Sequence, residues 1–228
     1  MSDNSRIMRL ITFLQNNKRL LFRATLFTLL IAFIILSCTV LFLPLEYLDI
    51  HISEEIQEKQ SPHLTTIMIW LSWFGRTSVS VVIVGITSLI FLISRLKKEA
   101  VLILSTLLSG ILGLGLKILI NRPRPSQDLV VLLEETKYQS FPSGHVLFYT
   151  VFFGALILII LYLKNIKYKL RLFLIIICLS MIFLGAVSRV YLGAHWFTDV
   201  LGGFILGVFC VLIIGYFYVK NDKNIPKA

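Results

Sequence analysis

Six apolar stretches fill most of the sequence and restrict the folds that it can adopt. A helix needs about 20 apolar residues to cross a bilayer, and the stretches fall at residues 24–44, 77–94, 100–119, 146–163, 171–187 and 199–219. The 228 residues are 57% hydrophobic and only 15% charged, which is too apolar for an ordinary soluble domain. The stretches lack strand-like alternation, which argues against a transmembrane β-barrel. We therefore predict an all-α, polytopic membrane protein with six transmembrane helices, forming a single domain over residues 1–228.

A further apolar segment, residues 64–74, is too short to cross a bilayer and ends at Gly75. Its two tryptophans, Trp70 and Trp73, suit the headgroup boundary, where indole rings are enriched. We expect a short interfacial or partly re-entrant helix here. The alternative is one long tilted helix that continues through Gly75 to Ile93.

Basic residues are unevenly shared between the two sides that six spans define. With both termini on one side, that side carries 15 of the 22 Lys and Arg residues but only three of the 12 acidic residues. The positive-inside tendency then makes the termini cytoplasmic in a protein of the cell membrane. This topology and contact with anionic lipid account for the net charge of +10, so the charge is no argument for nucleic-acid binding.

Two longer loops, residues 45–63 and 120–143, fall on the predicted outer side. The first contains five acidic residues. We expect it to form a solvated amphipathic segment, and the alternative is a flap that covers a site.

Three polar clusters interrupt the apolar pattern at predicted helix ends, all on the outer side. They are KILINRPRP, FPSGH and SRVYLGAHWFTDV, at residues 117–125, 141–145 and 188–200. A charge within a span costs about 2.5–3.5 kcal/mol or more, so a purely structural protein has little reason to collect Lys117, Arg124 and Arg189. Arg presents a fork of donors that matches phosphate oxygens, and Lys adds a mobile point charge. These cations indicate an anion site.

The first two clusters contain features that would position such a site. Pro123 and Pro125 keep the loop around Arg124 extended, because the residue before a proline is excluded from the α region. In FPSGH, Ser143 is a good N-cap and Gly144 lets the backbone approach a ligand. The free amides of a helix N-terminus bind anions, and His145 follows directly. The alternative for this cluster is an ordinary capped helix start with an interfacial histidine.

The third cluster places His195 and Asp199 four residues apart, hence on one face of a helix. A carboxylate that accepts the Nδ1–H of a histidine fixes its tautomer and makes Nε2 more basic, as a nucleophile or general base requires. A second histidine could then protonate the leaving group. The alternatives are a helix-start pair and a zinc site of His145, His195 and Asp199. Neighbouring cations and the absence of HExxH or Cys spacing disfavour zinc.

The motifs Lys117-x6-Arg124-Pro125, Pro142-Ser143-Gly144-His145 and Ser188-Arg189-x5-His195-x3-Asp199 together resemble a known signature. It is that of the type-2 phosphatidic acid phosphatase superfamily of integral membrane lipid phosphatases, a pattern shared with vanadium-dependent haloperoxidases and bacterial acid phosphatases. Within the superfamily, the chain is most similar to the phosphatidylglycerophosphatase B type.

The resemblance implies roles for the motif residues. His195 would be the nucleophile that forms a phosphohistidine, and Asp199 would orient it. His145 would protonate the departing lipid oxygen and then activate water. The residues expected to hold the phosphate are Lys117, Arg124, Ser143, Gly144 and Arg189. Arg122 is a candidate accessory headgroup contact.

The resemblance also implies that no metal or other cofactor takes part. Expected substrates are phosphatidylglycerol phosphate and, as alternatives, phosphatidic acid or undecaprenyl pyrophosphate. The competing functions are a transporter or flippase of anionic lipid and a metal-dependent hydrolase at the same site. Few ionisable residues lie in the middles of the spans, which disfavours transport.

Overall fold

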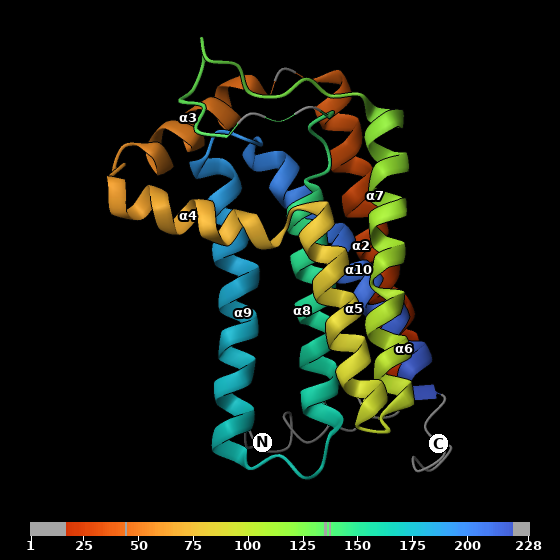
Figure 1. Cartoon of the computed structure of the whole chain (residues 1–228). Helices are drawn as coiled ribbons and strands as arrows, with labels where there is room; N and C mark the ends of the chain where they lie inside the picture. The colour runs from red at the N-terminus through yellow and green to blue at the C-terminus, as the bar shows by residue number, and fades with distance from the viewer. Residues whose placement is uncertain (1–16, 44, 135, 137, 221–228) are drawn as a thin grey trace, which may run out of the picture.

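The computed structural model describes residues 17–43, 45–134, 136 and 138–220. Within these ranges the chain forms α-helices and loops, without strands (Figure 1). In chain order the helices are α2 (Lys18–Phe42), α3 (Glu46–Gln57), α4 (Pro62–Phe74), α5 (Thr77–Ile93), α6 (Lys97–Ser105), α7 (Leu107–Ile120), α8 (Gly144–Tyr162), α9 (Tyr168–Tyr191) and α10 (Phe197–Lys220).

Five helical stretches are long and apolar enough to cross a membrane. They are α2, the stretch Lys97–Ile120 formed by α6 and α7, then α8, α9 and α10. A sixth is obtained only if α4 and α5 are counted together, and these two helices are bent by 62°. The chain is thus a multi-pass, all-α membrane protein with five or six candidate spans, where the sequence predicted six.

The segment 64–74 forms a helix of its own, α4, which crosses the bundle near one end (Figure 1). At its start the Ser61 side chain accepts a hydrogen bond from the Leu64 amide, and Pro62 occupies the first turn. At its end the Gly75 amide bonds back to Ser72, and Arg76 adopts an extended conformation before α5 begins. The alternative of one continuous helix through Gly75 is therefore wrong.

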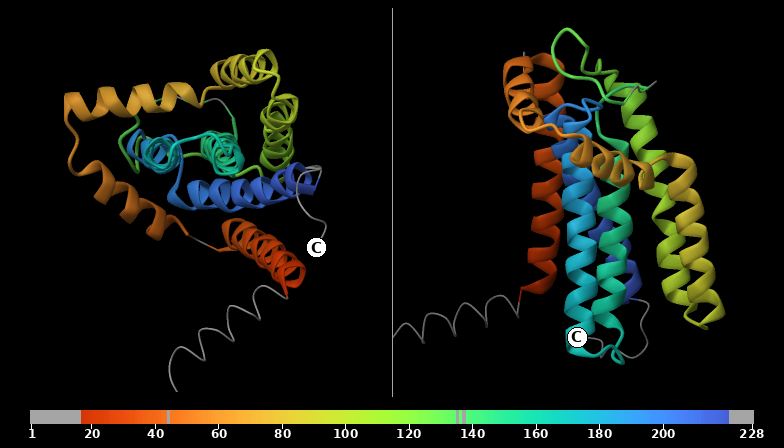
Figure 2. Two further views of the ribbon diagram at one scale, coloured as in Figure 1. Left: turned by 90° about the horizontal axis from the view of Figure 1, so that it is seen from below. Right: turned by 60° about the vertical axis from the view of Figure 1, so that its left-hand side comes forward.

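Helix α8 lies at the centre of the bundle, with the other spans around it (Figure 2). It is mostly apolar, and half of its apolar window is buried, the largest share among the candidate spans. One side packs Leu147 and Val151 into a core with residues of α2, α7 and α10. Another side packs Phe152 and Ile159 against α5 and α6. The burial of α8 fixes the position of its N-terminal turn, which carries the FPSGH motif.

Glycines let α10 approach α8 closely beside that turn. A Cβ on Gly203 would lie 2.6 Å from the carbonyl oxygen of Ser143, and a Cβ on Gly207 would lie 2.5 Å from Cβ of Thr150. The Ser143 amide accordingly donates a 3.0 Å hydrogen bond to the carbonyl of Asp199 in the first turn of α10. Close packing of two helices thus joins the second motif to the third.

Helix α3 confirms the amphipathic segment predicted within residues 45–63, and four of its five acidic residues are exposed. The exception is Asp49, which forms a buried polar face with Ser53 and Gln57. This face packs against α9 and α10. The spacing of four residues puts all three side chains on the same side of the helix.

We expect Gly203→Ala to destabilise the protein by about 1–3 kcal/mol, because the added methyl group meets a backbone carbonyl that cannot move away cheaply. For a chain of this size the melting temperature should fall by about 2–4 °C per kcal/mol. Thermal unfolding in detergent micelles measures the change. The matched control is Gly115→Ala, where an added Cβ meets nothing within 4 Å. Equal melting temperatures for the two variants would contradict the close contact.

Candidate active site

The three sequence motifs meet at one end of the bundle, where α7 ends, α8 begins and α9 connects to α10 (Figure 1). Lys117 lies in the last turn of α7 and Arg189 in the last turn of α9. Both charges, and that of Arg124, act on the ring of His195. His195 in turn lies close enough to His145 to interact electrostatically. The structure therefore gathers the residues that the sequence grouped into one site.

His195 lies in the loop between α9 and α10 and is only 2% exposed. Its Nδ1 is 3.4 Å from Oδ2 of Asp199 and 3.4 Å from Oγ of Ser140. The same Oδ2 accepts hydrogen bonds from the Ser140 hydroxyl and, at 3.0 Å, from the Trp196 amide. Because an ionised carboxylate only accepts, this arrangement favours a proton on Nδ1 and a lone pair on Nε2.

The Nε2 atom of His195 is 3.3 Å from Nη1 of Arg124. A guanidinium only donates, so this contact favours the same tautomer. Burial, followed by the positive charges of Arg124 and Lys117, lowers the pKa of His195 well below its usual value of 6.5. The imidazole is therefore neutral at neutral pH, and its Nε2 keeps a lone pair, which faces the Arg124 guanidinium in this structure.

Backbone carbonyls hold Arg124 in place. Its Nε donates to the Tyr138 carbonyl, its Nη1 to the Ala194 carbonyl at 2.5 Å and its Nη2 to the Gln139 carbonyl at 3.3 Å. Burial and the nearby charge of Arg189 lower the pKa of Arg124 to about 10. The side chain stays protonated at neutral pH, and its charge is not neutralised by these carbonyls.

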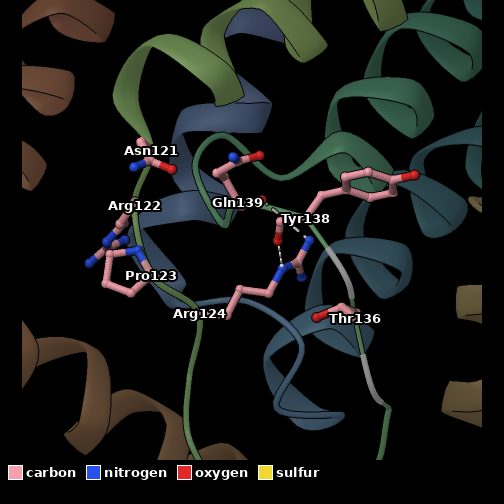
Figure 3. Close-up of a pocket in the computed structure, with 7 residues that line it drawn as sticks. All are labelled: Asn121, Arg122, Pro123, Arg124, Thr136, Tyr138 and Gln139. Carbon is pink, nitrogen blue, oxygen red and sulfur yellow. Dashed lines mark hydrogen bonds between the residues drawn. The ribbon is translucent and has the colours of Figure 1, made fainter.

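An open hollow of about 490 Å³ lies beside Arg124 (Figure 3). The loop after α7 and the segment before α8 line it with Asn121, Arg122, Pro123, Arg124, Thr136, Tyr138 and Gln139. Asn121 ends α7 in the left-handed conformation, with φ of 47°. Residues 121–126 then run without helix or turn, as the prolines predict. Arg124 thus links the hollow to the ring of His195.

Lys117 is buried, and its Nζ donates to two backbone carbonyls, that of Gln139 at 2.6 Å and that of Ser140 at 3.2 Å. The Ser140 amide donates to the Arg122 carbonyl at 2.9 Å. These bonds join the segment before α8 to the loop after α7. They also place Lys117 beside Gly144, where an added Cβ would lie 3.7 Å from Cε of the lysine.

Ser143 occupies the N-cap position of α8, as predicted, but its side chain makes no capping hydrogen bond. Its hydroxyl is buried and lacks a partner among the described residues. The expectation of a side-chain cap is therefore wrong. Ser143 is instead held through its backbone by the Asp199 carbonyl, which leaves the hydroxyl available for another group.

His145 follows in the first turn of α8, and its Nε2 is also buried without a partner in the described part of the chain. The bend between α4 and α5 lies directly against its ring. A Cβ on Gly75 would be 2.4 Å from Cδ2 of His145, so only glycine fits at this point of the bend.

Arg189 is fully buried, and only one of its terminal nitrogens is engaged. Nη1 donates to Oε2 of Glu134 at 2.8 Å and to the Ser72 hydroxyl, which itself donates to Glu134 at 2.7 Å. Nε and Nη2 have no partner among the residues that the structure describes. Burial alone would raise the pKa of Glu134, but Arg189, Ser72 and Arg76 together lower it. The carboxylate is thus ionised at neutral pH and positions the guanidinium.

The expectation that Arg122 contacts a headgroup is not supported. Its guanidinium is only 10% exposed and points away from Arg124 (Figure 3). Its terminal nitrogens donate to Asp199, Thr198 and Asp49. The physical reason is the pair of buried carboxylates nearby, which attract the guanidinium into the protein.

Residues outside the three motifs also build the site, and sequence reasoning missed them. Ser140 bonds Asp199, Ser72 and Glu134 bond Arg189, and Asp49 bonds Arg122. Only Asp49 left a signal in the sequence, because its spacing to Ser53 and Gln57 describes one polar helix face.

Metal ligands are not grouped in the part of the chain that the structure describes, which contains no set of three or more His, Cys, Asp or Glu side chains suited to a metal. The cysteines are free thiols: Cys38 is exposed, Cys178 is buried and Cys210 is partly buried. The zinc alternative finds no ligand set here. Cofactor-free chemistry remains a prediction.

The comparisons with known proteins agree with the motif resemblance. Residues 98–223 match the family model described as the PAP2 superfamily. Phosphatidylglycerophosphatase B of Bacillus subtilis is 30% identical over 206 residues, covering 88% of this chain and 96% of that protein. An undecaprenyl-diphosphatase of Sulfolobus acidocaldarius is 30% identical over 187 residues, covering 78% of this chain and 84% of that protein.

Two solved structures share the fold. One is a transmembrane PAP2-type phosphatidylglycerolphosphate phosphatase from Bacillus subtilis, with a TM-score of 0.80, 25% identity and coverage of 88% of this chain and 99% of that chain. The other is Aquifex aeolicus LpxE, with a TM-score of 0.57, 26% identity and coverage of 76% and 95%. The similarity extends over most of each chain.

We expect Glu134→Gln to lower the free energy of unfolding by about 2 kcal/mol at neutral pH, because a hydrogen bond between charged groups is lost. The pKa of Glu134 is lower in the folded protein than its usual 4.5. Its contribution is therefore fully present above pH 4.5 and is lost as the pH falls through the folded-state pKa. Unfolding measured in micelles against pH should show the two proteins converging in acid. The control is Glu55→Gln, whose side chain is 69% exposed; a pH-independent difference would contradict the role of ionised Glu134.

Proposed function

This chain belongs to the PAP2 superfamily, and from that premise we propose that it is a metal-independent phosphatase of membrane lipid phosphates. The proposed reaction passes through a phosphohistidine at His195. Phosphatidylglycerol phosphate is the substrate that we favour.

The observation that carries the proposal is a set of buried polar atoms without partners. Of seven such side-chain atoms in the described ranges, four belong to motif residues: Oγ of Ser143, Nε2 of His145, and Nε and Nη2 of Arg189. A buried donor left unpaired costs about 1–3 kcal/mol, so a fold keeps several together only where something compensates. The tetrahedral oxygens of a phosphate would satisfy these groups at once.

In the first step, the Nε2 lone pair of His195 attacks phosphorus while the bond from phosphorus to the lipid oxygen breaks. Lys117, Arg124 and Arg189 stabilise the charge on the phosphoryl oxygens, which is the main contribution that a protein makes to phosphoryl transfer. His145 donates its proton to the departing lipid oxygen. Asp199 accepts the Nδ1–H of His195 and stabilises the positive charge that the ring acquires.

In the second step, water attacks the phosphohistidine, and the nitrogen–phosphorus bond breaks. His145, which gave up a proton in the first step, accepts one from this water as it attacks, and this restores the state in which the cycle began. Inorganic phosphate and neutral His195 are the products. Each histidine thus serves both half-reactions, and the chemistry requires no cofactor.

The proposed location of the site is the outer face of the cell membrane. The site and the described chain ends lie at opposite ends of the bundle (Figure 1). The end with the chain termini carries most of the basic residues, among them Arg23, Lys97, Lys164 and Lys220. The positive-inside tendency makes that end cytoplasmic. A lipid phosphate would then reach the outer site laterally, with its acyl chains remaining in the bilayer.

The relatives support a lipid phosphate or pyrophosphate as the class of substrate, and the particular lipid is our proposal. Two of its relatives are a phosphatidylglycerophosphatase and an undecaprenyl-diphosphatase. The Bacillus subtilis protein is matched over 96% of its length, which favours phosphatidylglycerol phosphate. Undecaprenyl pyrophosphate as the main substrate is the alternative, and phosphatidic acid is a further candidate.

We expect His195→Ala to lower phosphate release by at least about 10⁴-fold, since a nucleophile is removed. His145→Ala should lower it by about 10²–10⁴-fold, as loss of a general acid does. The measurement is phosphate release in detergent micelles with EDTA, using the three candidate lipids. His51→Ala, at a largely exposed histidine on α3, is the matched control and should behave as wild type.

Each contrary outcome identifies a different error. Full turnover by the His195→Ala variant would exclude a phosphohistidine intermediate at this residue. Loss of activity in EDTA, with recovery on addition of a divalent cation, would make the protein a metal-dependent hydrolase. Lipid movement across vesicles without phosphate release would instead support the transporter alternative.

A further inference from the structure

We propose that Asp49 of α3 is a positioning residue for the reaction, acting on His195 through Arg122 and Asp199. The inference rests on the proposed function, because it takes His195 as the nucleophile. It concerns a residue outside the three motifs, on a segment that sequence reasoning expected to be solvated.

Asp49 is completely buried and uses both carboxylate oxygens at the start of α10. Oδ1 accepts a 2.9 Å hydrogen bond from the Thr198 amide, and Oδ2 accepts a 2.8 Å bond from the Thr198 hydroxyl. The first amides of a helix lack intrahelical partners and carry partial positive charge. Asp49 thus caps α10 from a different helix, through Thr198, which lies three residues after His195.

Arg122 connects this carboxylate to the one beside the nucleophile. Its Nη2 donates to Oδ2 of Asp49 at 2.6 Å, and its Nη1 donates to Oδ1 of Asp199 at 2.5 Å. Nη1 also donates to the Thr198 hydroxyl at 2.7 Å. A planar guanidinium holds its N–H donors in a fixed fork. When Asp49 binds Nη2, the direction in which Nη1 donates to Asp199 is therefore fixed as well.

As a consequence, the two carboxylate oxygens of Asp199 bind different partners. Arg122 occupies Oδ1, while Oδ2 is left for Ser140, the Trp196 amide and His195. A carboxylate that could rotate would exchange these roles and let the imidazole turn or change tautomer. Asp49 prevents this by holding Arg122 from the opposite side.

The charge count supports the same conclusion. Arg122 sits between two buried carboxylates, Asp49 and Asp199. With Asp49 present, one guanidinium charge is shared, so Asp199 keeps negative charge with which to stabilise a positive ring on His195. Without Asp49, Arg122 would neutralise Asp199 alone.

The test uses Asp49→Asn in the full-length protein. The amide oxygen of the new side chain can still accept the Thr198 N–H, so the cap of α10 is kept. Its NH2 group would face the Nη2 donor of Arg122, which breaks that contact, and would also replace the acceptor of the Thr198 hydroxyl. We expect kcat to fall by about 10–100-fold with little change in KM, as for other groups that orient a catalytic histidine.

A second measurement separates positioning from a general loss of structure. Ring ¹⁵N NMR of histidine-labelled protein, assigned with His195→Ala, reports the tautomer of His195 without any substrate. We expect one tautomer, protonated at Nδ1, in the wild type and a mixture in Asp49→Asn. Glu54→Gln, at an exposed acid of the same helix, is the control and should match the wild type in both measurements.

Thr198→Val provides a milder variant that keeps the backbone amide and the side-chain shape, and it should shift both measurements in the same direction.

Unchanged tautomer and unchanged kcat in Asp49→Asn would overturn the inference. A lower kcat together with a lower melting temperature and an unchanged tautomer would also overturn it, because that pattern indicates a purely structural role for Asp49. If Asp49→Asn does not fold, wild-type behaviour of Thr198→Val overturns it. Absence of phosphate release by the wild type would refute the proposed function instead, and the tautomer would still decide the role of Asp49.

Discussion

The buried carboxylate of Asp199 is the interaction on which the arrangement of the site depends. It accepts hydrogen bonds from Arg122 in the loop after α7, from Ser140 before α8 and from the Trp196 amide before α10, and it lies beside His195. A carboxylate removed from water is costly unless it is paired and hydrogen-bonded. The same requirement therefore brings three distant chain segments together and orients the imidazole.

The cations of the site differ in how far the protein neutralises them. Arg122 is shared by two carboxylates, and Arg189 has one carboxylate on one of its three nitrogens. The hydrogen bonds of Lys117 and Arg124 go to backbone carbonyls, which leave the charge of each in place. Positive charge is thus concentrated where the motifs meet, beside the open hollow at Arg124. This is the electrostatic arrangement that a phosphoryl-transfer transition state requires.

The sequence predicted what depends on local pattern and failed where the fold decides. Apolar windows located the membrane helices, since length and composition suffice for this. The three motifs located the cations and histidines by residue type and by their place at predicted helix ends. The spacing of four put His195 on one helix with Asp199, but His195 lies in the loop before α10. The polar face of Asp49 is equally compatible with solvent and with burial, so its environment could not be read locally. Glu134 lies in a loop, where no periodicity marks a residue that meets Arg189 only after folding.

The N-terminal part of the chain completes a site whose signature lies elsewhere. The family match covers residues 98–223 and so excludes α3, α4 and α5. Yet Ser72 bonds Arg189, and the backbone at Gly75 lies against His145. A continuous helix through Gly75 would carry these contacts away from the site, because α4 could not then turn across the bundle. The 62° bend is therefore what allows one segment to support two motif residues, and the catalytic end of the bundle needs it as much as it needs the motifs.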